Sequence, residues 1–133
     1  MALQFSKCVA SCLSAILLCG SGCHRDAALL QGGTAGTIEL RGVKRADMQL
    51  NVFEDAPSPR RLAYGVSGAQ GHFSLIADDG LEPATLPPGK YRLTLESVAA
   101  DPIPIPAGYR DVKTTSLKID WPSDDGQLNV NVH

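Results

Sequence analysis

Cysteine is absent from the sequence beyond position 23, and this absence limits both stability and chemistry. All four cysteines lie near the start of the chain, as Cys8, Cys12, Cys19 and Cys23. A domain built from the later residues has no disulfide, so its stability must come from packing. Because three of the four precede an expected cleavage site, no metal or iron–sulfur centre is predicted.

Histidine is also scarce, and no arrangement for nucleophilic catalysis can be assembled. The three histidines are His24 in an expected tether, His72 on the solvent side of an expected strand, and His133 at the last position. None has a neighbouring nucleophile and an orienting acid, and no H-x-x-E spacing occurs. The sequence therefore predicts a protein that is not an enzyme and that holds no cofactor and no metal.

The sequence also has no excess of basic over acidic residues. The chain carries 12 Lys and Arg against 14 Asp and Glu, with a formal net charge of -2. The basic pairs Lys44–Arg45 and Arg60–Arg61 stand among acidic residues, so nucleic acid is not an expected partner. With 133 residues, 44% of them hydrophobic and 20% charged, the sequence suits one domain with one core.

The first 23 residues have the organisation of an export signal. A short segment ends at Lys7, an apolar run extends from Cys8 to Cys19, and small residues precede Cys23. The apolar run is far shorter than the roughly 20 residues of a membrane-spanning helix. Residues 1–22 are therefore predicted to be a signal peptide.

The residues around the expected cleavage site resemble a bacterial lipobox. The segment Leu17–Cys23 reads LLCGSGC, with a small residue directly before Cys23. The resemblance implies that Cys23 is acylated and anchors the protein in the cell envelope, facing the periplasm; ordinary secretion is the alternative. His24 differs from the Asp that retains some lipoproteins at the inner membrane, which favours the outer membrane.

The exported part is expected to comprise a tether and a single β domain. Residues 23–36 are predicted to be the lipidated cysteine and a flexible, glycine-rich tether. Residues 37–133 show short alternating runs bounded by Gly, Pro, Asp and Asn, the pattern of an all-β sandwich. Seven strands are predicted, at Thr37–Arg41, Met48–Glu54, Arg61–Ser67, His72–Ala77, Lys90–Ser97, Thr115–Trp121 and Gln127–Val132.

Alternation assigns the faces of the strands. Phe73, Leu75 and Ala77 share one face, and so do Tyr91, Leu93 and Leu95. Gly89 is expected to turn the chain into the second of these strands, and Tyr91 is expected to enter the core with its hydroxyl at the rim.

Three motifs follow one another in a recognisable order. They are Gly71–Leu75 (GHFSL), Leu86–Leu93 (LPPGKYRL) and Ile105–Tyr109 (IPAGY). They resemble the carboxypeptidase regulatory-like and transthyretin-like domains of small bacterial envelope lipoproteins. The resemblance covers about residues 34–133 and implies a seven-stranded antiparallel sandwich of the immunoglobulin-like or prealbumin-like kind.

A proline-rich segment is the candidate interaction edge. In Asp101–Gly108, DPIPIPAG, alternate prolines hold the chain extended. Ile103 and Ile105, with Tyr109, are candidate contacts for another envelope protein, because pre-ordered apolar groups lose little entropy on docking. The alternative is that both isoleucines pack as core.

These features predict a non-catalytic, lipid-anchored structural or protein-interaction module. The alternative is a module that binds carbohydrate or calcium. Acidic turns at Asp78–Glu82 and Asp120–Gly126 offer carboxylate oxygens to calcium. The candidate aromatics for stacking on a sugar are Phe53, Tyr64 and Tyr109.

Overall fold

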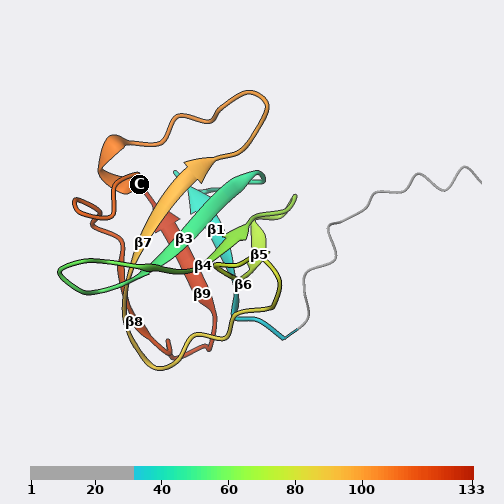
Figure 1. Ribbon diagram of the computed structural model, residues 1–133. Coiled ribbons are helices and arrows are strands. Elements are labelled where there is room, and N and C mark those ends of the chain that lie inside the picture. Colours follow the sequence, from blue (N-terminus) through green and yellow to red (C-terminus); the bar gives the residue numbers. More distant parts are fainter. Residues whose placement is uncertain (1–31) are drawn as a thin grey trace, which may run out of the picture.

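The chain forms two β-sheets that pack against each other, as the computed structural model shows for residues 32–133 (Figure 1). The expected signal peptide, Cys23 and most of the tether lie outside these described residues. The β1 sheet contains β1 (Ala35–Leu40), β2 (Val43–Lys44), β5 (His72–Ser74) and β9 (Leu128–Val132). The β3 sheet has the order β6 (Ile76–Ala77), β4 (Arg61–Val66), β3 (Met48–Glu54), β7 (Gly89–Ser97), β8 (Lys118–Trp121). The all-β sandwich prediction is confirmed.

The core between the sheets is built by alternating side chains, as the sequence predicts. In β9 the burial pattern alternates between buried and exposed from Leu128 to Val132. The predicted inward residues Phe73 and Leu75 are fully buried, and His72 is exposed on the opposite face of β5. Within residues 32–133, no helix is long and apolar enough to cross a membrane.

The predicted strand His72–Ala77 is divided between the two sheets. β5 pairs with β1, whereas β6 pairs with β4 in the other sheet. Leu75 lies between them and is fully buried, with its N–H donating to the carbonyl of Thr34 at 2.8 Å. Side chains keep alternating between the two faces where the chain passes from β5 through Leu75 to β6. The pattern of apolar residues therefore does not reveal the change of sheet.

The fold begins earlier than the sequence predicts. β1 starts at Ala35, and Thr34 is buried, with its N–H donating to the carbonyl of Ala84 at 2.8 Å. The Thr34 hydroxyl also accepts a hydrogen bond from the N–H of Leu86 at 3.0 Å. Residues 34–36 therefore belong to the sandwich and not to a flexible tether.

The pairing of the first and last strands corrects the expected antiparallel arrangement. β1 and β9 are parallel, with Gly36 opposite Leu128 and Leu40 opposite Val132. The turns at 67–71 and 123–126 each link strands of different sheets, β4 to β5 and β8 to β9. Gly71 has a φ of 73°, as expected of a glycine in such a turn.

Tyr91 occupies its predicted place at the margin of the core. It is 6% exposed, and its hydroxyl donates a hydrogen bond to the carbonyl of Pro87. Burial raises the pKa of this hydroxyl. Gly89, which is expected to turn the chain into this strand, is the first residue of β7.

Tyr91→Phe is expected to lower the free energy of unfolding by about 1 kcal/mol, because the carbonyl of Pro87 loses its donor while the ring still fills its site. Denaturation by urea measures this effect. Tyr109→Phe is the control, since its hydroxyl makes no hydrogen bond within residues 32–133 and the change should stay within about 0.5 kcal/mol. Equal losses in the two variants would contradict the role of the hydroxyl.

Candidate functional site

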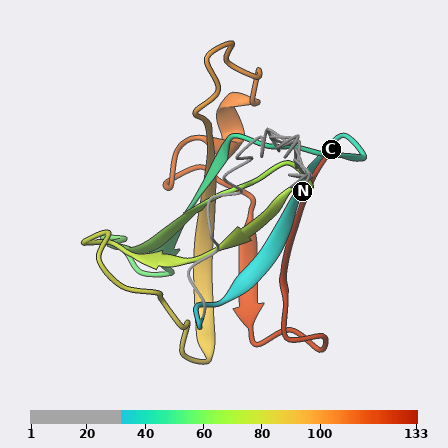
Figure 2. The same cartoon turned by 90° about the vertical axis from the view of Figure 1, so that its right-hand side faces the viewer.

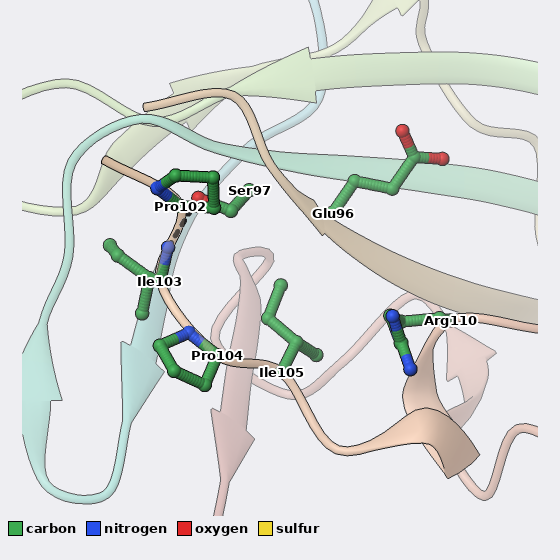
Figure 3. A pocket seen from close by; sticks show the side chains of 7 residues that line it. All are labelled: Glu96, Ser97, Pro102, Ile103, Pro104, Ile105 and Arg110. Atoms are coloured by element: carbon green, nitrogen blue, oxygen red, sulfur yellow. Dashed lines mark hydrogen bonds between the residues drawn. The ribbon is translucent and has the colours of Figure 1, made fainter. Parts of the chain in front are cut away.

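A groove of about 600 Å³ lies beside the carboxyl end of β7 (Figure 3). Three parts of the chain line it: the end of β7, the proline-rich segment that follows and the residue after the short helix η1 (Ala107–Tyr109). The lining residues are Glu96, Ser97, Pro102, Ile103, Pro104, Ile105 and Arg110. Figure 3 shows Glu96 and Arg110 on one side, the segment from Pro102 to Pro104 on the other, and Ile105 between them.

The proline-rich segment is held in place by one hydrogen bond and by burial. The N–H of Ile103 donates to the Oγ of Ser97 at 2.9 Å. Ile105 is 9% exposed and belongs to the hydrophobic core, while Pro102 and Pro104 are exposed. Pro106 has φ -54° and ψ 139°, which are polyproline II values. The wall of the groove is therefore ordered before anything binds to it.

The structure shows that the isoleucines pack with the core, which was the alternative interpretation, and their role as an interaction edge stays a prediction. Ile105 is buried in the core and Ile103 packs partly against it, yet both also line the groove. The predicted contact Tyr109 is half-buried against the core and does not line the groove. Sequence reasoning missed Glu96 and Arg110, which come from outside the proline-rich segment.

The carboxylate of Glu96 is oriented by a hydrogen-bonded chain on the outer face of the β3 sheet. Its Oε1 accepts from the Nδ2 of Asn51 at 3.0 Å, and Asn51 is 2% exposed. The Oδ1 of Asn51 accepts from Gln49 at 2.9 Å and from the Nη1 of Arg61 at 3.3 Å. These contacts fix an acidic group at the groove, and the exposed Arg110 supplies the opposite charge.

A second pocket, of about 330 Å³, is lined by residues whose charges compensate one another. Its lining residues are Asp55, Lys90, Lys118, Ile119 and Asp120. The Nε of Arg92 donates to Asp55 at 2.6 Å, and this hydrogen bond lowers the pKa of the Asp55 carboxyl. The Nζ of Lys90 lies 4.0 Å from Asp120. Two acidic and two basic residues line the pocket, so it offers little net charge to a ligand.

The acidic turns use their carboxylates internally. Asp78 accepts from the Nε of Arg61 at 2.5 Å, and Asp79 accepts from the N–H of Leu81 at 3.0 Å. Asp125 accepts hydrogen bonds from the N–H of Gln127, from the hydroxyl of Ser123 and from the Nδ2 of Asn129. These hydrogen bonds lower the pKa of its carboxyl. Within residues 32–133, no group of three or more His, Cys, Asp or Glu side chains is placed to hold a metal ion.

The three candidate aromatics do not form a stacking platform. The guanidinium of Arg61 lies over the ring of Tyr64, 5.3 Å from its centroid, and so covers one face of that ring. Phe53 is half-buried, and Tyr109 packs against the core.

No family model, curated protein or solved structure matches this chain.

The side chains that line the groove indicate what kind of ligand it can contact. The groove brings apolar side chains together with a carboxylate and a guanidinium, an arrangement that can contact both apolar and charged side chains of an extended peptide.

Proposed function

We propose that this protein is a non-catalytic interaction module of the bacterial cell envelope, anchored by a lipid on Cys23, whose groove binds an extended segment of another envelope protein. The observation that carries the proposal is the proline-rich segment from Pro102 to Ile105, which lines one groove together with Glu96 and Arg110. A wall that is rigid before binding loses little conformational entropy on docking.

The charges of the groove give the proposed contact its specificity. Glu96 attracts a basic side chain and Arg110 an acidic one, so a partner segment carrying both signs around an apolar residue fits the groove. The hydrogen bond from buried Asn51 keeps the Glu96 carboxylate in position.

The proposed location and family rest on sequence features. The export signal, the small residues before Cys23 and the absence of Asp after it support a lipoprotein of the outer membrane. Membership of the carboxypeptidase regulatory-like or transthyretin-like domains is supported by the G-x-F motif, whose Phe73 is fully buried, and by the P-G-x-Y motif with Tyr91 in the core. The alternative, a carbohydrate or calcium module, has less support because Tyr64, Asp78 and Asp125 are already engaged within the fold.

The groove is tested by crosslinking in the native envelope. A photoreactive residue at exposed Pro104 of the full chain is expected to capture a partner, and Arg110→Glu is expected to reduce that product about tenfold, because it turns an attraction into a repulsion. Lys113→Glu is the matched control, since Lys113 is exposed, carries the same charge and does not line the groove. If both variants crosslink equally, the groove is not the docking surface.

A further inference from the structure

The last strand, β9, forms an open edge of the β1 sheet. Among the residues that the structure describes, β9 pairs with β1 alone. Figure 2 shows β9, drawn in red, at the margin of the molecule with no strand beyond it. Leu128, Val130 and Val132 are buried, whereas Asn129 and Asn131 are exposed.

The backbone groups on this open edge belong to the two asparagines. The N–H of Arg41 donates to the carbonyl of Val132 at 2.7 Å, so Val132 directs its polar backbone groups toward β1. Successive residues of a strand direct their backbone N–H and C=O groups toward opposite edges. Asn129 and Asn131 therefore direct both groups away from β1, toward the open edge. The outward groups of Gln127 are already satisfied, by Asp125 at 3.0 Å and by Ser123 at 2.7 Å. The open stretch therefore begins at Asn129.

The other edges of the described sheets carry protection that β9 lacks. β8 presents exposed Lys118 and Asp120, β2 and β6 have two residues each, and β5 has three. Charge and shortness are the means by which natural sheets discourage further pairing. β9 has five residues, LNVNV, with no charged residue and no proline.

We propose that β9 pairs antiparallel with β9 of a second copy of this chain. The strand is nearly palindromic, so a two-fold axis at Val130 places Asn129 opposite Asn131 of the second copy and Leu128 opposite Val132. The two asparagines of each copy then exchange backbone hydrogen bonds across the axis, and no like charges meet. The two β1 sheets join into one continuous sheet, and each copy keeps its own groove.

The register of this pairing is tested by disulfide formation in the envelope. Two full chains with different tags, one Asn129→Cys and one Asn131→Cys, are co-expressed and mildly oxidised. Directly opposed residues of this kind lie about 5.5 Å apart at Cα, within the range of a disulfide. Residue 129 of one copy and residue 129 of the other lie about 8 Å apart, outside that range.

We expect the mixed pair to form a disulfide between the two differently tagged chains. Each variant expressed alone is expected to form at least about tenfold less disulfide-linked dimer. The chain without new cysteines gives the background from Cys23. The absence of the mixed disulfide, or equal crosslinking of the single variants, would overturn the proposed pairing.

A second measurement uses the backbone donor itself. Asn131→Pro removes the outward N–H without removing a hydrogen bond to β1, whereas Asn131→Ala keeps it. Sedimentation of the full chain in detergent should show dimers for the original protein and for Asn131→Ala, and monomers for Asn131→Pro. A dimeric Asn131→Pro protein would contradict the proposal. If that variant fails to fold, the disulfide pair decides, since each introduced cysteine keeps its backbone N–H donor and C=O acceptor.

Discussion

Gly36→Ala is expected to lower the free energy of unfolding by at least about 3 kcal/mol. Gly36 lies in β1 between β5 and β9, opposite Phe73 and Leu128. A Cβ at this position would stand 1.8 Å from the carbonyl oxygen of Leu128 and 2.9 Å from the Cζ of Phe73. The nearer atom is backbone, so the contact is relieved only by moving β9 away from β1 and breaking their parallel ladder.

Urea denaturation followed by the fluorescence of Trp121, the single tryptophan, measures this loss. Gly108→Ala is the matched control, because a Cβ there meets nothing within 4 Å and the change should stay within about 0.5 kcal/mol. A Gly36→Ala protein as stable as Gly108→Ala would show that β1 and β9 do not approach so closely.

The strands and their faces could be predicted because the two-residue period and the turn residues are local properties. The predicted bounds of Met48–Glu54 are those of β3, and the inward faces of Phe73 and Tyr91 are confirmed by their burial. Each of these predictions depends on residues a few positions apart in the sequence, because side chains alternate between the two faces of a strand.

The features that escaped prediction depend on contacts between distant parts of the chain. Gly36 lies in a segment assigned to the tether, and its small size becomes meaningful only when Leu128 is brought beside it. The change of sheet after β5 leaves the alternation of residues 72–77 intact, so the sequence pattern is the same for one strand and for two.

For the same reason the sequence indicates only the proline-rich part of the groove, and the binding of a partner there stays a prediction. Alternate prolines mark Asp101–Gly108 as an extended segment, and the groove does lie there. Burial of Ile105, however, is decided by packing against the core. Glu96 and Arg110 join the groove through the path of the chain after β7, which no local pattern specifies.

Cys23→Ala is expected to abolish fatty-acid labelling and to move the protein from the membrane fraction to the soluble fraction. Two or three acyl chains contribute about 0.8 kcal/mol per buried methylene, so the acylated form is attached in an effectively permanent way. Cys23 precedes Gly32 by nine residues, which span at most about 32 Å when extended. The Gly32 carbonyl accepts from the Thr85 hydroxyl at 3.1 Å, so a lipid on Cys23 would keep this end of the sandwich near the bilayer.

Cys19→Ala is the matched control, because Leu18 precedes Cys19 where acylation requires a small residue. Metabolic labelling with a fatty-acid probe and fractionation of the envelope measure both variants. Cys19→Ala should keep the label and remain in the membrane. Label and membrane retention in the Cys23→Ala protein would refute the lipid anchor at Cys23, and their loss in Cys19→Ala alone would place the anchor four residues earlier.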